Sequence, residues 1–340
     1  MAFLMNSWYV AAWADELGKE QMLPRQLLNQ PVVMFRRRDG VAVALADRCA
    51  HRFAPLHMGR LVDDSIECAY HGLRFDCSGK CSFNPHGNGN IPPRAQVRSY
   101  PLAERYNLLW IWMGKPEQAD PAAIPEFAFL SDASFQNVKG YTLAEGHYEL
   151  MTDNIMDLGH IEFLHPGLLG SDAVRKAFTE IVQNGNTVFS NRLTADEVLP
   201  PVLQQWYEVG DQQVQRWLNV RWDPAANMKL TVGVLPNGQP RDSAHESQGC
   251  HLMTPATETT THYFWAQGRN WGTPDPAMDA LRLNSLRTAF DTQDKPMIEA
   301  VQRNMGTTDL DSLQPVMLST DGGPVRARRV LKQLIAEGVA

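Results

Sequence analysis

The sequence Cys49-Ala-His51, followed after sixteen residues by Cys68-Ala-Tyr-His71, decides how the first third of the chain must fold. Each stretch offers one thiolate and one imidazole, and Gly72 directly after the second stretch allows a tight backbone turn. Two Cys and two His could hold a structural zinc ion, but zinc sites of this composition usually take both Cys from one turn and both His from one helix. One Cys and one His in each loop instead favour a [2Fe-2S] cluster with two Cys on one iron and two His on the other.

A cluster with these ligands is of the Rieske type, and its neutral His ligands raise the reduction potential above that of an all-thiolate cluster. It can therefore accept electrons from an ordinary ferredoxin or flavin donor. Two further cysteines, Cys77 and Cys81, flank a Ser-Gly turn and are predicted to be small buried residues, since four ligands already complete the cluster. A group that only carries electrons needs an acceptor elsewhere in the chain.

Composition limits the class of protein. The chain has 340 residues, 44% of them hydrophobic, with a formal net charge of -7, and this length predicts two domains. The negative charge argues against nucleic-acid binding, which needs concentrated Lys and Arg. Five cysteines do not suggest a disulfide framework, and the sequence has neither a signal peptide nor eighteen consecutive apolar residues. We therefore expect a cytoplasmic protein that does not associate with membranes.

The domain boundaries follow from changes in the pattern of apolar and turn-forming residues along the chain. Short apolar runs separated by Gly, Pro, Asn and Asp predict an all-β domain over residues 1–115, with the cluster loops at hairpin ends. Within it, Arg36-Arg37-Arg38-Asp39-Gly40 predicts a charged hairpin turn, which could also serve as a docking surface for an acidic redox partner. Residues 116–140 contain several Pro and indicate a linker, so residues 141–340 form the second domain.

The second domain begins with Asn154-Ile-Met-Asp157-Leu-Gly-His160-Ile-Glu-Phe-Leu-His165-Pro166. The apolar residues here have helical spacing, and Asp157 and His160, three residues apart, can then share a site. On a straight helix His165 would point away from His160, but Pro166 disfavours helical geometry before it, so the chain can bend and bring the second imidazole back. Two His with one carboxylate from elsewhere make the facial triad of non-heme Fe(II) oxygenases.

The alternative for this segment is two unrelated histidines, one of them near a helix end where its charge is favoured. An electron-carrying cluster and an iron that activates dioxygen imply one another, so we favour the iron site. Three other histidines have no comparable context and are predicted to be structural: His57, His86 and His147.

With both metal motifs placed, the chain resembles the oxygenase components of Rieske non-heme iron oxygenases, in the branch of the vanillate and dicamba O-demethylases. The resemblance extends from Asn6-Ser-Trp8-Tyr9 near the start to His262-Tyr-Phe-Trp-Ala-Gln-Gly-Arg269-Asn270 near the end. It implies an α+β fold, with an N-terminal all-β Rieske [2Fe-2S] domain and a C-terminal catalytic domain of the helix-grip type, in which an antiparallel sheet curves around helices.

The resemblance also implies roles for single residues at the iron. Asp294 is the position that matches the third iron ligand, although Asp291 and Glu299 are competing carboxylates in the sequence. Asn154 would lie close to the iron without necessarily binding it.

The same resemblance implies a homotrimer in which subunits meet head to tail. Asp157 would bridge His160 at the iron of one subunit and the cluster ligand His71 of a neighbouring subunit. This role agrees with the general habit of carboxylates to orient metal-bound His.

A later strand supplies a candidate for substrate binding. Alternation along Cys250-His-Leu-Met-Thr places His251 and Met253 on one face. His251 is therefore a candidate to line the pocket and to hold an anionic or phenolic substrate group, and a hydrogen-bonded core histidine is an equal alternative.

The function implied by the resemblance is the terminal oxygenase of a monooxygenase that uses O2 and demethylates a substituted aromatic acid to a phenol and formaldehyde. No Gly-x-Gly-x-x-Gly follows a strand, so electrons from NAD(P)H must come through a separate reductase, with or without a ferredoxin. The alternatives are methyl or benzylic hydroxylation of an aromatic acid or sulfonate, and a Rieske electron-transfer protein without catalysis.

Overall fold

The computed structural model describes residues 3–338, which separate into two compact units. Residues 5–124 and 254–257 form the N-terminal unit, and the other described residues form the C-terminal unit. The main boundary, after Ile124, lies within residues 116–140. No helix of the described residues is long and apolar enough to cross a membrane.

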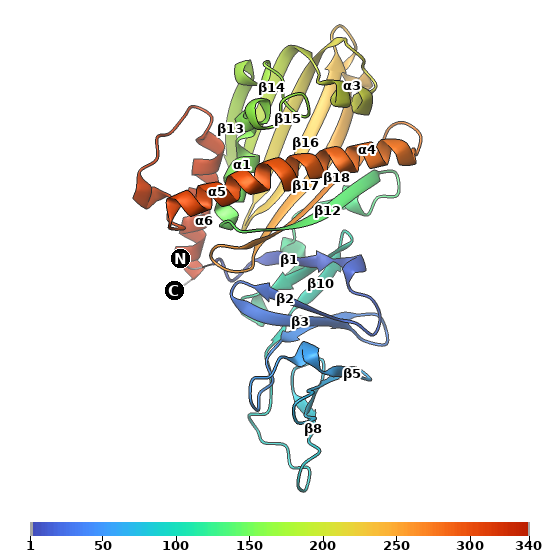
Figure 1. The fold of residues 1–340 in the computed structure, drawn as a ribbon, viewed down its shortest axis with the longest axis vertical. Coiled ribbons are helices and arrows are strands. Elements are labelled where there is room, and N and C mark those ends of the chain that lie inside the picture. Colours follow the sequence, from blue (N-terminus) through green and yellow to red (C-terminus); the bar gives the residue numbers. More distant parts are fainter. Residues whose placement is uncertain (1–2, 339–340) are drawn as a thin grey trace. The chain divides into compact units, whose positions relative to one another are not determined.

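Strands build the N-terminal unit, as its short apolar runs predict (Figure 1). The strands are β1 (Trp8–Trp13), β2 (Met22–Leu27), β3 (Gln30–Arg36), β4 (Ala42–Ala46), β5 (Arg60–Val62), β6 (Ser65–Glu67), β7 (Arg74–Phe75), β8 (Cys81–Phe83), β9 (Ser99–Tyr100), β10 (Leu102–Arg105) and β11 (Leu108–Trp112). They form three sheets with the orders β1-β11-β10, β2-β3-β4-β9 and β5-β6-β7-β8. The predicted charged turn joins β3 to β4, where the Arg37 N–H donates to the Val41 carbonyl at 2.9 Å.

A seven-stranded sheet with helices forms the C-terminal unit. Its strands are β12 (Gln136–Ala144), β13 (Phe178–Asn184), β14 (Thr187–Val198), β15 (Gln213–Asp223), β16 (Asn227–Pro236), β17 (His245–Pro255) and β18 (Thr261–Arg269). The sheet order is β12-β18-β17-β16-β15-β14-β13, with antiparallel neighbours such as β12 and β18. The helices are α1 (Tyr148–Met156), α2 (Ile161–Leu164), α3 (Pro201–Tyr207), α4 (Pro276–Arg287), α5 (Lys295–Met305) and α6 (Gly322–Gly338).

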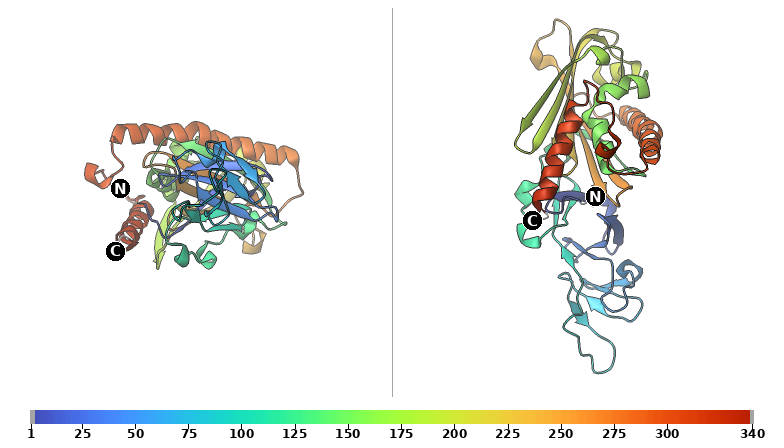
Figure 2. Two further views of the ribbon diagram at one scale, coloured as in Figure 1. Left: turned by 90° about the horizontal axis from the view of Figure 1, so that it is seen from below. Right: turned by 90° about the vertical axis from the view of Figure 1, so that its left-hand side faces the viewer.

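Helices α4 and α5 run on from one another across the sheet, joined by a π-helical turn over Thr288–Asp294 (Figure 1). The right-hand view of Figure 2 shows this long helix to one side of the strands. A π-helical turn inside an α-helix is rare and often marks a functional site. The sheet and this helix confirm the predicted α+β, helix-grip architecture.

Helix α1 ends earlier than the hydrophobic spacing suggests. Asp157 is extended, with φ -115° and ψ 95°, and a 3-10 turn over Leu158–His160 follows it. The Asp157 carboxylate accepts the Gly159 N–H at 2.8 Å, which starts the new turn. Asp157 and His160 therefore do not share one helix, and the chain changes direction at Asp157 before it reaches Pro166.

Helix α6 packs against α1 through a partly buried ion-pair cluster. Arg328 contacts Asp153 at 2.6 Å and Glu149 at 2.8 Å. His147, just before α1, is buried, and its backbone N–H donates to Gln302 Oε1 at 2.9 Å. This packing is consistent with a structural role for His147.

His147 should make the protein sensitive to acid. Burial lowers the pKa of His147 from its ordinary value of 6.5 to about 3. Between these values only the unfolded chain takes up the proton, so stability falls as the pH falls. Relative to His147→Gln, the wild type should lose up to about 3 kcal/mol of unfolding free energy between pH 6.5 and about pH 4. Urea unfolding at both pH values measures this, and equal losses in the two proteins would contradict it.

Candidate metal centres and substrate pocket

The two loops that carry Cys and His share one backbone pattern. In each loop the Cys N–H donates to the carbonyl five residues later, and the N–H four residues later donates back to the Cys carbonyl, at 2.8–3.0 Å. The residues four positions after the cysteines, Phe53 and Gly72, have φ 59° and 69°. Gly72 therefore adopts the left-handed conformation that its place in the sequence suggests.

These loops bring four metal-binding donors together in two pairs. Cys49 and Cys68 are each 2% exposed, and the rings of His51 and His71 lie 4.5 Å apart between centroids. Burial raises the pKa of the Cys49 thiol to about 11, and the neighbouring Cys68 adds to this effect. Such thiols give up their protons readily only to a metal ion. The donor set therefore fits a [2Fe-2S] cluster with two sulfur and two nitrogen ligands.

The remaining cysteines of this unit are engaged elsewhere. Cys81 is buried and its thiol donates to the Phe83 carbonyl at 3.3 Å. The Cys77 thiol, half-buried, donates to the Asp64 carbonyl at 3.1 Å. Neither therefore competes as a cluster ligand.

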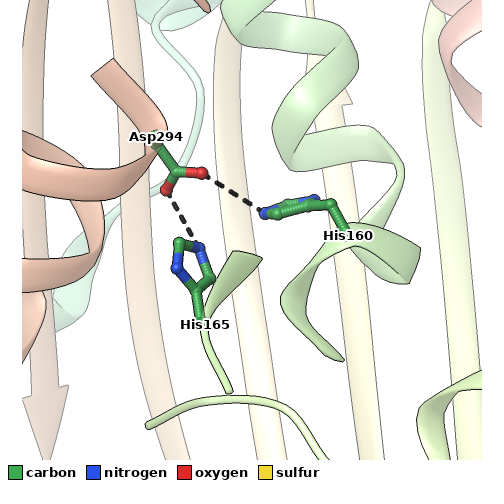
Figure 3. A group of neighbouring side chains, drawn as sticks. All are labelled: His160, His165 and Asp294. Atoms are coloured by element: carbon green, nitrogen blue, oxygen red, sulfur yellow. Dashed lines mark ion pairs between the residues drawn. The ribbon is translucent and has the colours of Figure 1, made fainter. Parts of the chain in front are cut away.

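A second group of donors lies in the C-terminal unit, where Asp294 faces both His160 and His165 (Figure 3). His160 Nε2 is 3.5 Å from Asp294 Oδ1, and His165 Nε2 is 3.2 Å from Asp294 Oδ2. Within residues 3–338, these three residues are the group of potential metal ligands whose donor atoms all lie within 4.8 Å of one another. Helix α2 ends at Leu164, and His165 is no longer helical, with φ -119° and ψ 48°, so both imidazoles reach one point.

Both imidazoles are oriented with Nε2 toward the carboxylate. His160 Nδ1 donates to the Asp157 backbone carbonyl at 2.8 Å, and His165 Nδ1 donates to Gln293 Oε1 at 2.7 Å. With the proton on Nδ1, the Nε2 lone pairs are free for a metal ion, which is the usual arrangement of metal-binding His.

The electrostatics of this group also favour a cation. Burial by itself lowers the pKa of His165, but the hydrogen bond and charge of Asp294, together with the hydrogen bond to Gln293, outweigh burial, so the net shift is upward. Burial lowers the pKa of His160, which keeps that ring neutral near pH 7. A buried carboxylate with two Nε2 atoms around it needs a positive charge between them, and two His with one carboxylate suit Fe(II).

The structure brings Asp294, but neither of the competing carboxylates, to the histidines. Asp291 accepts a hydrogen bond from Thr142, and Glu299 accepts the Glu145 N–H at 3.0 Å. Asn154 does lie at the site, where its Nδ2 donates to Asp294 Oδ1 at 3.0 Å.

The contact between Asp157 and His160 differs from the expected one. The backbone carbonyl of Asp157, rather than its carboxylate, contacts His160. The carboxylate forms an ion pair with Arg192, a buried side chain of β14. It also borders a surface cavity of about 620 Å³ beside His160, so it remains available to a group outside this chain.

A second cavity, of about 90 Å³, opens beside the three ligands. Most of its lining is apolar and includes Ile155, Leu158, Leu203, Leu218, Leu230, Val232 and Phe290. This volume is smaller than the roughly 150 Å³ cavity known to take up benzene, so a substituted aromatic ring could enter only if the lining side chains move apart. The polar lining residues include His251, Ser247, Gln267 and Arg216.

His251 lines this cavity, and it is also hydrogen-bonded within the core. Its Nδ1 lies 2.6 Å from the hydroxyl of Tyr263. Burial lowers the pKa of His251 to about 4, against a smaller opposite effect of Asp294. The imidazole is therefore neutral near pH 7 and can hold a substrate group by a hydrogen bond rather than by a full charge.

Three side chains at these sites were not identified from the sequence: Gln293, Arg192 and Tyr263. Gln293 directly precedes Asp294 in the π-helical turn, and this adjacency was a usable signal. Arg192 and Tyr263 come from strands β14 and β18 and carry no local motif, since sheet pairing alone brings them near Asp157 and His251.

Comparisons with known proteins agree with both metal centres. Residues 7–101 match the Rieske [2Fe-2S] domain, and residues 144–337 match the vanillate O-demethylase oxygenase C-terminal domain. The chain is 37% identical to the oxygenase component of dicamba O-demethylase from Stenotrophomonas maltophilia, over 98% of both chains.

One further relative and one solved structure are also similar over nearly their whole length. The iron-sulfur subunit of the toluene-4-sulfonate monooxygenase system from Comamonas testosteroni is 34% identical, over 98% of this chain and 97% of that one. The crystal structure of dicamba monooxygenase with non-heme iron and dicamba superposes with a TM-score of 0.87 at 36% identity, over 100% of this chain and 99% of that one.

Proposed function

Because this chain belongs to the Rieske non-heme iron oxygenases, we propose that it is the terminal oxygenase of a multicomponent monooxygenase that demethylates a methoxylated aromatic acid. The observation that carries the proposal is the placement of three cation ligands at the wall of an apolar cavity. A pure electron carrier has no use for either feature.

The side chains that would hold the cluster are Cys49, His51, Cys68 and His71. The side chains that would hold Fe(II) are His160, His165 and Asp294. When bound, the cluster supplies single electrons and the iron supplies dioxygen activation for attack on a C–H bond.

The chain's own residues position the ligands and the substrate. Asn154 donates to Asp294 Oδ1, and Gln293 accepts from His165, so both ligands are held before substrate enters. The apolar walls exclude water and keep one aromatic ring beside the ligands. His251 supplies a hydrogen bond to a polar substituent of the ring.

Demethylation balances in atoms and electrons. One oxygen atom of O2 enters the methyl C–H bond of the ether, and the other leaves as water with two electrons and two protons. In the resulting hydroxymethyl ether, the bond between the CH2 carbon and the aryl oxygen breaks and the hydroxyl proton passes to the aryl oxygen, which releases a phenol and formaldehyde.

The electrons come from NAD(P)H through a reductase, with or without a ferredoxin. His51 is exposed and His71 is partly exposed, so a donor protein can approach the cluster edge directly. The cytoplasm suits this chemistry, because an oxidising compartment would convert thiolate ligands to disulfides.

A head-to-tail homotrimer would let the cluster of one subunit serve the iron of the next. The two loops that carry Cys49 and Cys68 expose Phe53 and Tyr70, which are 61% and 62% exposed. The surface cavity beside Asp157 is lined in part by Met297 and Val316, and both are also exposed. Two apolar surfaces of this kind favour association between copies of the chain.

Reductase-coupled turnover with NADH tests the reaction. A panel of methoxybenzoates, matched methylbenzoates and toluenesulfonates is offered, and substrate loss, formaldehyde and hydroxylated products are recorded together. We expect formaldehyde in step with the loss of a methoxybenzoate. An alcohol without formaldehyde would contradict demethylation.

The second candidate is hydroxylation of a methyl group on an aromatic acid or sulfonate. The 34% identity to the toluene-4-sulfonate monooxygenase subunit favours it. The same cavity and iron ligands would serve this hydroxylation. The reaction would stop at the alcohol, because a methyl group bound to carbon has no ether bond that can break afterwards.

A further inference from the structure

We infer that Tyr263 selects the tautomer of His251 and thereby restricts substrates to aromatic compounds that present a hydrogen-bond acceptor to this imidazole. The inference rests on the proposed function, since it concerns the same cavity, and it deepens that function by naming what the substrate must carry.

Tyr263 and His251 form a rigid pair on the neighbouring strands β18 and β17. Both side chains are buried, and their rings lie nearly parallel, 6.0 Å apart between centroids at 20°. The ring of Phe290 packs against both, at 5.8 Å from Tyr263 and 5.5 Å from His251. The imidazole is therefore held in one orientation.

The direction of the Tyr263–His251 hydrogen bond follows from burial. In the part of the chain that the structure describes, the Tyr263 hydroxyl has no acceptor other than His251 Nδ1. If Nδ1 donated instead, the hydroxyl proton would be buried without a partner, which is costly. Burial also raises the pKa of Tyr263 well above 10, so the hydroxyl keeps its proton. Tyr263 therefore donates to Nδ1, and the imidazole proton must sit on Nε2.

The Nε2–H of His251 faces the cavity beside Gly249. His251 and Gly249 both line the cavity, and Nε2 lies 3.7 Å from the position that a Cβ atom on Gly249 would take. Within residues 3–338, the hydrogen bond of the His251 side chain is made by Nδ1, not by Nε2. Nε2 is thus a donor directed at the space where substrate binds.

Among the other polar side chains of the lining, Ser247 and Gln267 are hydrogen-bonded, whereas Nε and Nη2 of Arg216 have no hydrogen-bond partner in the described residues. Ser247 is hydrogen-bonded to Tyr207 at 2.7 Å, and Gln267 Oε1 accepts from Arg282 at 2.9 Å. Arg216 is paired with Glu197 at 3.0 Å, which compensates its charge. Arg216 can therefore contribute to the selection of a hydrogen-bond acceptor beside His251, and only a variant that acts through His251 measures the share of the imidazole.

An Nε2–H donor in a fixed orientation favours ligands that carry a hydrogen-bond acceptor and disfavours ligands that present a hydrogen-bond donor. A carboxylate, sulfonate, phenolate or ether oxygen can accept the proton. A substrate that presents an ammonium or other donor at this point leaves two donors face to face, without a partner for either. The cavity should therefore select oxygen acceptors.

The test measures dissociation constants of the holoenzyme by calorimetry, with a methoxybenzoate as the probe. Tyr263→Phe should weaken binding about fivefold, the effect of one neutral hydrogen bond. In a His251→Gln background the same change should have less than a twofold effect, because the Gln amide donates whatever residue stands at position 263. Equal weakening in both backgrounds, or none in the wild type, overturns the inference.

The chain offers a matched control. Tyr141 is hydrogen-bonded to His262 Nδ1 at 2.8 Å, a Tyr–His pair that does not line the cavity. Tyr141→Phe should leave the dissociation constant unchanged. An effect as large as that of Tyr263→Phe would overturn the inference, because it would show that binding responds to the loss of any tyrosine–histidine hydrogen bond in the sheet.

A second measurement needs no variant. The wild type should bind a methoxybenzoate at least about tenfold more tightly than the matched methoxybenzylammonium, since only the former accepts the Nε2–H. Equal binding overturns the inference and leaves the proposed reaction intact. If the wild type neither binds nor turns over any methoxybenzoate, the proposed function falls, and the inference falls with it.

Discussion

Asp294→Ala is expected to lower the iron content from about three to about two atoms per chain and to abolish turnover, given a two-iron cluster and one mononuclear iron. Asp294 is the carboxylate that both His160 and His165 face, and it is 4% exposed. Without it, two neutral imidazoles remain, and a buried Fe(II) loses the negative charge that balances it. Elemental analysis with acid-labile sulfide determination separates cluster iron from mononuclear iron.

The matched control is Asp291→Ala, one turn earlier in the same π-helical segment. Asp291 accepts a hydrogen bond from Thr142 and does not face the histidines. This variant should retain about three iron atoms per chain. Full iron content in Asp294→Ala, or equal loss in both variants, would sink the ligand assignment.

Asp157→Asn is expected to retain both metal sites while turnover falls by about 100-fold, an effect at the upper end for groups that orient metal ligands. Asn keeps the acceptor oxygen that the Gly159 N–H requires, so the turn before His160 should persist. It loses the negative charge that faces Arg192 and the surface cavity. That charge is the proposed link to the cluster ligand His71 in a neighbouring subunit.

Three measurements separate electron transfer from structural damage in Asp157→Asn. Iron and sulfide content should match the wild type, sedimentation should show the same oligomer, and the pre-reduced cluster should reoxidise slowly with substrate and O2. Asp311→Asn is the control, since Asp311 lines the same cavity and pairs with Lys332 at the surface. Normal turnover by Asp157→Asn would exclude the bridge.

Much of the chemistry could be predicted from the sequence because it resides in short local motifs. Cys49, His51, Cys68 and His71 lie in two loops whose spacing already indicated a Rieske cluster, and the structure gives both loops one backbone pattern. The histidines His160 and His165 lie in one segment for the same reason. The α+β architecture followed from the resemblance, and the two matched domains confirm it.

The contacts that complete each site could not be predicted in this way, because they join residues far apart in the chain. Asn154 and Asp294 are 140 positions apart, and Arg192 is 35 positions from Asp157. The spacing in the sequence placed Asp157 and His160 on one helix, whereas a local hydrogen bond to Gly159 starts a new turn there. A short side-chain to backbone bond of this kind competes with helix continuation and leaves no periodic signal.

The donor types, their grouping into two metal sites and the family to which the chain belongs therefore follow from the residues and their spacing. Which of three carboxylates reaches the histidines, how each imidazole is oriented and which donor faces the cavity became visible only in the folded chain. The physical reason is that metal preference follows from the chemistry of the side chains, which any sequence displays. Orientation instead depends on strand pairing and burial, which bring Tyr263 to His251 and Gln293 to His165.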